Sequence, residues 1–217
     1  MTVGILGAGA FGTSLSIALS TPNKKLILWT QNQGTVKSIQ EVRENRLRLP
    51  GYILPEQIIA TNDIAEIKDC SIVLIAVPMQ QLRSLVEMHG SILKGKILVA
   101  CCKGFEVSSG LGPTAILEIA SEKTAVLTGP SFASDLASGF PTALTIASKI
   151  EGLAKYIQKE LGTEILRLYW SNDPIGAELG GALKNVIAIG CGVTIGAGYG
   201  SSSVSYTHLR AHETIAN

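Results

Sequence analysis

The chain has 217 residues, which is enough for one domain and part of another. Hydrophobic residues make up 46% of it and charged residues only 16%, so the sequence can bury a large core and lacks the composition of a disordered protein. The formal net charge of +1 provides no general attraction to nucleic acid or to an anionic membrane, and neither partner is expected.

Several features of the sequence indicate a cytoplasmic protein with no membrane span. No basic leader or cleavage site of a signal peptide is visible. The longest uncharged apolar run, residues 186–200, is shorter than the ~20 residues of a membrane-spanning helix. The cysteines form no Cys-x-x-Cys motif, so reduced, mostly buried thiols and no metal site are expected at Cys70, Cys101, Cys102 and Cys191.

A glycine-rich turn follows the first apolar run of the chain. Residues 3–6 are apolar, Gly7-x-Gly9-x-x-Gly12 comes next, and residues 15–19 have helical spacing, which predicts a strand, a tight turn and a helix. In such a turn the first glycine permits the bend, the second lets the backbone approach a pyrophosphate, and the third lets helix and strand pack closely. The helix start offers free N–H groups to phosphates. We therefore predict dinucleotide binding here, with a plain turn as the alternative.

The second strand is predicted over residues 25–29, and its carboxyl end should contact the adenosine ribose of a dinucleotide. An acidic residue at that place favours NAD, whereas an arginine favours NADP. The three residues that follow, Thr30, Gln31 and Asn32, are all neutral. The residues therefore leave the choice between NAD and NADP open.

Strands and helices then alternate up to about residue 170. A helix is predicted over 35–46, an irregular loop at Pro50-Gly51, a short strand over 58–60, and a brief helix capped by Asn62 or Asp63. The remaining predicted strands are 71–77, 96–100, 124–127, 142–147 and 165–169, and the remaining helices are 79–88 and 151–161. This alternation predicts an α/β fold with a Rossmann-like doubly wound parallel sheet.

Two of these strands end in residues that are placed for ligand binding, because ligands of open α/β sheets lie beyond the carboxyl ends of the strands. Lys103 follows the strand over 96–100, and we favour a ligand-binding role for it over that of an ordinary solvated lysine. Gly-Pro-Ser-Phe-Ala at residues 129–133 follows the strand over 124–127 and offers free N–H groups and a hydroxyl where a helix begins.

The character of the sequence changes at residues 171–174. Asp173 can cap a helix and Pro174 suits the first helical position, so a helix is predicted from there to about residue 195. Three glycines between residues 176 and 181 lower its helical propensity, and we expect another element to pack closely against them. We interpret this helix as the central helix of a second, all-helical domain.

Lys184 lies in the middle of this helix among apolar neighbours. Partial desolvation lowers the pKa of a lysine and suits it to general-base chemistry. The alternative is a lysine that extends from a buried helix to the surface.

Together these motifs resemble the NAD(P)-dependent glycerol-3-phosphate dehydrogenase family, from Thr2 to about Gly200. The most specific matches are Gly-Pro-Ser-Phe-Ala at 129–133 and the segment 176–188, which contains Glu-Leu-Gly-Gly-Ala-Leu-Lys-Asn. Further matches are residues 7–12, Leu28-Trp29, Asn45 with Leu49-Pro50, residues 76–78 and Lys103-Gly104.

The resemblance implies hydride transfer between NAD(P)H and dihydroxyacetone phosphate, which yields sn-glycerol 3-phosphate for glycerophospholipid synthesis. It implies that Lys184 is the proton acceptor and that the substrate lies near Lys103, Gly129, Ser131 and Lys184. The residues that it places at the cofactor, NAD or NADP, are Gly7, Gly9, Ala10, Phe11, Gly12, Gln31, Lys103 and Ala133. It also implies a small phosphorylated substrate as partner and a homodimer for the full-length protein.

The sequence departs from the family pattern at Arg48, Gln31, Asp135 and Ile195, and the residue at position 31 leaves an NADP preference open. The pattern fails after Gly200, although the family continues. We therefore expect a dinucleotide-binding domain over 1–171, the first helix of a truncated helical substrate domain over 172–200, and an off-pattern tail over 201–217. The alternatives are a truncated, non-catalytic dinucleotide-binding fragment and a related hydroxyacid dehydrogenase.

Overall fold

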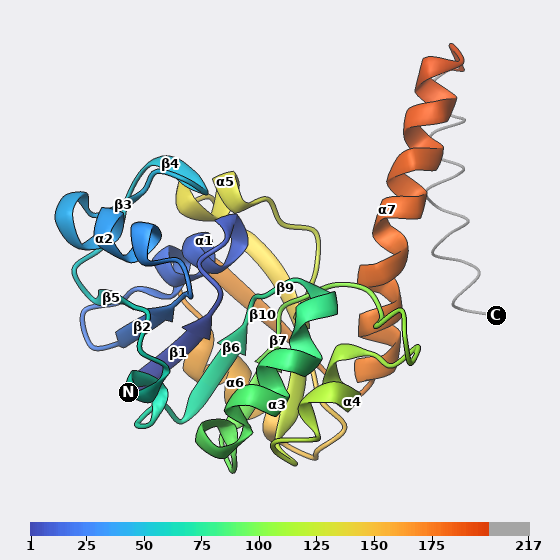
Figure 1. The fold of residues 1–217 in the computed structure, drawn as a ribbon. Coiled ribbons are helices and arrows are strands. Elements are labelled where there is room, and N and C mark those ends of the chain that lie inside the picture. Colours follow the sequence, from blue (N-terminus) through green and yellow to red (C-terminus); the bar gives the residue numbers. More distant parts are fainter. Residues whose placement is uncertain (200–217) are drawn as a thin grey trace.

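The protein is built on one eight-stranded sheet, shown in Figure 1, and the computed structural model describes residues 1–199 apart from the side chain of Asn185. The strand order is β10-β9-β8-β7-β6-β1-β2-β5. The strands are β1 (Thr2–Leu6), β2 (Lys25–Trp29), β5 (Ile58–Thr61), β6 (Ile72–Ile75), β7 (Ile97–Ala100), β8 (Thr124–Thr128), β9 (Thr142–Ala147) and β10 (Leu166–Ser171). The predicted Rossmann-like doubly wound fold is confirmed.

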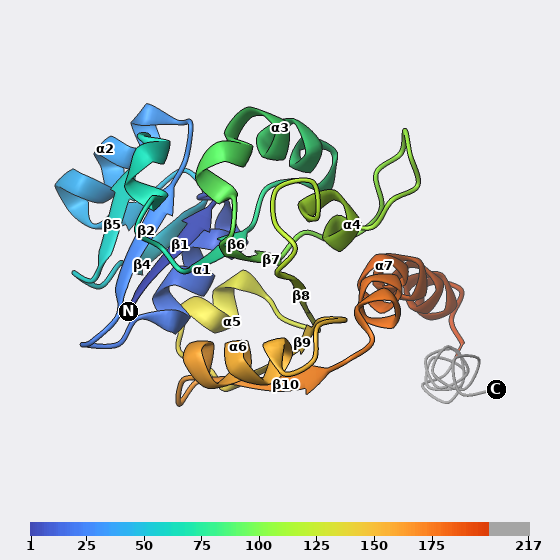
Figure 2. The ribbon, with the colours of Figure 1, turned by 90° about the horizontal axis from the view of Figure 1, so that it is seen from below.

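Helices cover both faces of the sheet, and Figure 2 shows α3 and α4 on one side with α5 and α6 on the other. The helices are α1 (Ala10–Leu19), α2 (Gln33–Val42), α3 (Leu82–Leu93), α4 (Pro113–Leu117), α5 (Ala133–Ala137), α6 (Leu153–Leu161) and α7 (Pro174–Gly196), with short 3-10 helices η1 (Ile64–Ile67) and η2 (Met79–Gln81). Neighbouring strand residues alternate between the two faces. Ile5 packs into the core beneath α1, whereas Leu6 packs into the core beneath α3.

The last two strands run opposite to the other six. Strand β9 pairs antiparallel with β8, and β10 pairs parallel with β9. The chain therefore leaves β8 and enters β9 at the same edge of the sheet, with only the five-residue helix α5 in the connection. Alternating strand and helix signals in a sequence do not reveal strand direction, so the sequence predicted a parallel sheet throughout.

A small antiparallel hairpin stands where an irregular loop was expected at Pro50-Gly51. It consists of β3 (Glu44–Asn45) and β4 (Leu49–Ile53). The predicted helix over 35–46 ends earlier, at Val42, because Arg43 adopts a left-handed conformation with φ of 55°. The Arg43 guanidinium donates to the carbonyl oxygens of Leu54, Pro55 and Ile58, and these bonds fix the hairpin against β5.

Helix α7 begins as the sequence predicted. The Asp173 side chain accepts a hydrogen bond from the backbone N–H of Gly176 at 2.8 Å, and Pro174 occupies the first turn. Of the three glycines near its start, Gly181 meets the expectation of close packing, because a Cβ there would lie 2.7 Å from Thr128 Oγ1. Gly180 has open space beside it, and a Cβ at Gly176 would only meet the capping carboxylate.

Most of α7 projects beyond the sheet and its covering helices (Figure 1). By length and composition alone α7 is long and apolar enough to cross a membrane, with a mean hydropathy of 1.4 over an 18-residue window. The core helices of other proteins pass the same test. Its exposed apolar side chains are Ile175, Leu179, Leu183, Val186, Ile189, Val193 and Ile195. The division of the chain at residue 171 stays a prediction, and the tail predicted over 201–217 lies outside the described residues.

We predict that Gly12→Ala lowers the free energy of unfolding by about 1–3 kcal/mol, because a Cβ at Gly12 would overlap the carbonyl oxygen of Gly7. Gly90→Ala in α3 is the matched control, since its Cβ would find its nearest neighbour, Ala120 Cβ, at 4.0 Å. Helical propensity should make that control about 0.5–1 kcal/mol more stable than the parent. Urea unfolding of the three proteins measures both effects, and equal stability changes in the two variants would contradict the packing argument.

Candidate active site

The glycine-rich turn between β1 and α1 has the geometry of a backbone anion site. Gly7 has φ of 111°, and a Cβ there would lie 2.6 Å from the carbonyl oxygen of Ala76. A Cβ at Gly9 would meet no atom within 4 Å, so the space beside this residue is open to a ligand. The first N–H groups of α1, at Ala10, Phe11 and Gly12, have no acceptor within the helix. The turn can therefore accommodate a pyrophosphate close to its backbone.

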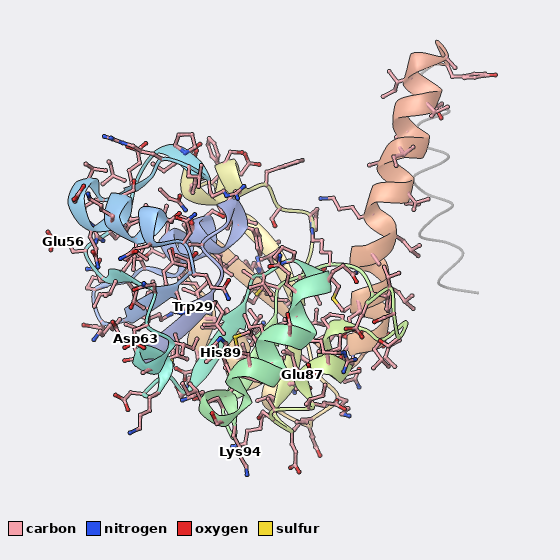
Figure 3. All side chains as sticks on the ribbon, viewed as in Figure 1. Trp29, Glu56, Asp63, Glu87, His89 and Lys94 are labelled. Carbon is pink, nitrogen blue, oxygen red and sulfur yellow. The ribbon has the colours of Figure 1, made fainter. Side chains whose placement is uncertain are left out.

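The carboxyl end of β2 is held by Trp29. Its indole donates to the carbonyl of Asn62 at 3.2 Å, and its ring lies edge-on to His89 of α3 with 5.6 Å between ring centroids (Figure 3). Asn32 caps α2 by accepting from the Thr35 N–H at 2.8 Å. Gln31, between them, is exposed just beyond the carboxyl end of β2. Its contact with a cofactor remains a prediction.

Lys103 lies just beyond β7, and its ammonium donates to the carbonyl of Gly129 at 3.2 Å. Desolvation by the surrounding protein, followed by the nearby positive charge of Lys184, lowers the pKa of Lys103 below its ordinary value. The two lysine side chains thus face one region. Two cations that share a region favour an anionic ligand between them.

Side chains of η2 and of the first turn of α3 anchor the loop that carries Lys103. The Gln80 amide donates to the Phe105 carbonyl at 2.9 Å, and its oxygen accepts from the Val107 N–H at 3.1 Å. Arg83 makes a two-pronged ion pair with Glu106, with distances of 2.8 Å (Nε to Oε1) and 2.7 Å (Nη2 to Oε2). The Arg83 guanidinium, with help from hydroxyl hydrogen bonds, holds the pKa of Glu106 at about 2. The sequence analysis did not identify these anchors.

Lys184 lies on α7 with its ammonium 5.3 Å from the centre of the Phe132 ring, within the range of a cation–π contact. A pocket of about 560 Å³ lies beside this contact, lined by α7 and by residues at the ends of β7 and β8. Three of the four predicted substrate-binding residues, Lys103, Gly129 and Lys184, line this pocket. Most of the other lining residues are small or apolar, and they include Thr128, Ala177, Gly181, Ile187 and Cys191.

The fourth predicted substrate-binding residue, Ser131, does not line the pocket, but its side chain has an unusual environment. Its hydroxyl oxygen is buried and has no hydrogen-bond partner among the described residues. Because an unpaired buried hydroxyl is costly, such an atom points to a ligand that completes its bonding. Ala133, predicted at the cofactor, begins α5 two residues later.

The sheet brings the predicted residues to one edge. The glycine turn follows β1, Gln31 follows β2, Lys103 follows β7 and Gly129 follows β8, and these four strands are parallel. Their carboxyl ends therefore meet at the same edge, where open α/β sheets bind ligands. The sheet order also separates Gln31 from the pocket, with β1 and β6 between β2 and β7.

Three of the four cysteines are buried as expected. Cys70, Cys101 and Cys102 lie in the core, and burial raises the pKa of Cys70 to about 11 and that of Cys102 to about 12. Cys191 is only half-buried, because it lies on α7 where the helix lines the pocket. No cluster of three metal-ligating side chains occurs in the part of the chain that the structure describes.

A buried carboxylate fixes α7 to the sheet domain. Glu178, only 7% exposed, accepts from the backbone N–H of Thr114 at 2.8 Å and from its hydroxyl at 2.7 Å. A Cβ at Gly112 would overlap this carboxylate, so the glycine makes room for it. In the sequence Glu178 stands out only as part of a motif, because nothing local identifies a partner 64 residues away.

We predict that Glu178→Ala lowers the free energy of unfolding by about 1–3 kcal/mol, because it leaves the buried Thr114 donors unpaired. Glu178→Gln should lose clearly less, since an amide oxygen can still accept both hydrogen bonds. Urea unfolding compares the two variants with the parent chain. Equal losses for alanine and glutamine would show that the hydrogen bonds to Thr114 do not anchor α7.

Comparisons with known proteins agree with this geometry. Residues 2–154 match the family model for the NAD-dependent glycerol-3-phosphate dehydrogenase N-terminus, and residues 173–216 match the model for its C-terminus. A glycerol-3-phosphate dehydrogenase [NAD(P)+] from Ruegeria sp. is 49% identical over 205 residues, and one from Roseobacter denitrificans is 49% identical over 207 residues. Each alignment covers 94% of this chain and 64% of the relative, so the chain spans less than two thirds of the relatives' length.

Among solved structures, glycerol-3-phosphate dehydrogenase from Coxiella burnetii superposes with a TM-score of 0.86 at 29% identity. That superposition covers 96% of this chain and 65% of the other. The N-terminal model covers the strands β1 to β9, and the C-terminal model covers α7. The chain belongs to the NAD-dependent glycerol-3-phosphate dehydrogenase family.

Proposed function

We propose that this protein transfers a hydride between NAD(P)H and dihydroxyacetone phosphate, with sn-glycerol 3-phosphate as the product of reduction and glycerophospholipid synthesis as its use. The observation that carries the proposal is the pair of lysines, Lys103 and Lys184, that face one pocket at the carboxyl edge of the sheet. Family membership favours this reaction over that of a related hydroxyacid dehydrogenase.

The glycine turn fits the cofactor. Open space beside Gly9 and the free N–H groups of α1 suit the pyrophosphate. Gly7, Gly9, Ala10, Phe11 and Gly12 would form the pyrophosphate cradle. The remaining cofactor contacts proposed are Gln31, Lys103 and Ala133. A bound nicotinamide supplies the hydride.

Within the pocket the two lysines have separate tasks. Lys184 donates a proton to the C2 oxygen of dihydroxyacetone phosphate as that carbonyl is reduced, and in the reverse direction it accepts the proton of the C2 hydroxyl. Lys103, which the Gly129 carbonyl already orients, offsets negative charge on the substrate.

The proposals for oligomeric state and cellular location rest on the family resemblance. The full-length protein is proposed to be a homodimer in the cytoplasm, and light scattering of the full-length protein would test the dimer.

We predict that Lys184→Met lowers the kcat for dihydroxyacetone phosphate reduction by about 100-fold or more, because the proton donor is lost. The loss of NADH or NADPH absorbance gives the rate, and cofactor fluorescence gives the dissociation constant, which should not change. Lys155→Met is the control, since Lys155 lies on α6 with its ammonium 4.3 Å from the Trp170 ring, outside the pocket.

Two results would contradict the proposal. Full turnover by Lys184→Met would remove this residue from proton transfer. Cofactor binding without any turnover in the parent chain would favour the alternative of a non-catalytic dinucleotide-binding fragment.

A further inference from the structure

Asn45 is a fully buried polar residue to which the proposed chemistry gives no task. It lies in β3 of the small hairpin and is 0% exposed. A buried side-chain amide is expected to use its hydrogen-bonding groups, and the partners that it chooses show what it holds.

The Asn45 amide joins the hairpin to the glycine-rich turn. Its nitrogen donates to the carbonyl oxygen of Ala8 at 2.9 Å and to Thr13 Oγ1 at 2.8 Å. Its oxygen accepts from the backbone N–H of Arg48 at 3.2 Å. The Arg48 donor and the Ala8 acceptor fix which end of the amide is nitrogen and which is oxygen. A single side chain thus contacts the turn before α1, the first helical turn of α1, and the hairpin.

The bond to Ala8 determines the direction of the next N–H group. The described residues contain no cis peptide bond, and in a planar trans peptide the C=O and N–H groups point in opposite directions. With the Ala8 carbonyl held towards Asn45, the Gly9 N–H is directed away from it. Within the described residues this N–H has no acceptor, and a Cβ at Gly9 would find no atom within 4 Å.

We infer that Asn45 is a positioning residue for the dinucleotide: it holds the Ala8–Gly9 peptide in the orientation that presents the Gly9 N–H to the pyrophosphate. The role rests on the cofactor binding of the proposed function. Without the amide donor, the Ala8 carbonyl loses its partner and the peptide is free to rotate. A carbonyl oxygen turned towards the phosphates would repel them, whereas the N–H attracts them.

A merely structural role for Asn45 predicts a different outcome. In that case its loss would weaken the hairpin and α1 without a specific effect on phosphate binding. Thr13→Val separates the two roles, because it removes one acceptor of the same amide and leaves the bond to the Ala8 carbonyl in place. Thr163→Val is a second control, since it removes a 3.0 Å hydrogen bond to the Ala18 carbonyl near the other end of α1.

The test compares ligands with and without a pyrophosphate. We expect Asn45→Ala to raise the dissociation constants of ADP-ribose and NADH by about tenfold, the effect of losing one hydrogen bond to a charged group. Adenosine, titrated by NMR, should bind as before. Thr13→Val and Thr163→Val should lose stability in urea and keep their affinity for ADP-ribose. If Asn45→Ala does not fold, Asn45→Asp replaces it, because aspartate has a similar volume and keeps the acceptor for the Arg48 N–H.

Unchanged ADP-ribose affinity in the Asn45 variant would overturn the positioning role, as would an equal loss for adenosine or for Thr13→Val. A parent chain that binds neither ADP-ribose nor NADH would overturn the proposed cofactor site itself, and the positioning role with it. The failure of the inference and the failure of the proposed function are therefore distinguishable in one set of titrations.

Discussion

The close approach of α7 to the end of β8 is the constraint on which the candidate active site depends. It occurs at Gly181, where even a methyl group would lie 2.7 Å from Thr128 Oγ1. Lys184 follows within one helical turn, and the carboxylate of Glu178 holds the helix about one turn before. A helix held between these two contacts has little freedom to slide or rotate. The position of Lys184 relative to Lys103 is therefore a consequence of packing rather than of any direct contact between the two lysines.

The same edge of the sheet carries the other predicted site residues. Parallel strands deliver the glycine turn, the Lys103 loop and the Gly129 turn to one side, and side-chain contacts fix the first two of them locally. Asn45 holds the first and the Arg83–Glu106 pair holds the second. Hydrogen bonds offset the cost of burying the polar atoms of Asn45 and Glu106, whereas the buried hydroxyl of Ser131 has no partner among the described residues.

The bounds of helices and strands could be predicted from the sequence where they depend on neighbouring residues. The apolar run at residues 25–29 gave the bounds of β2, and Asp173-Pro174 gave the start of α7, because strand burial and helix capping depend on adjacent residues. The hairpin β3–β4 could not be predicted in this way. It contains Pro50 and Gly51, which are typical of loops, and the Arg43 side chain that stabilises it binds carbonyls more than ten residues away in the sequence.

The predictions that failed, and the residues that were missed, share a dependence on contacts distant in sequence. Strand β9 is antiparallel to β8 because the connection between them stays at one edge of the sheet. The alternation of side chains along a strand has the same period whichever way the strand runs, so the sequence does not reveal this direction. Asn45 contacts Ala8 across 37 residues and Glu178 contacts Thr114 across 64, so neither task has a local signature. Family motifs named Lys103, Gly129 and Lys184, which line one pocket in the structure, and the roles of these residues stay predictions.

The central claim, that the pocket between β8 and α7 holds the phosphorylated substrate between two lysines, is tested most directly by chemical protection. Lysines of the chain would be reductively methylated with and without NADH and glycerol 3-phosphate, and each site quantified by mass spectrometry. The account predicts that the ligands slow the modification of Lys103 and Lys184 and leave Lys94 and Lys155, outside the pocket, unchanged. Equal modification of Lys103 and Lys184 with and without bound ligands would contradict it.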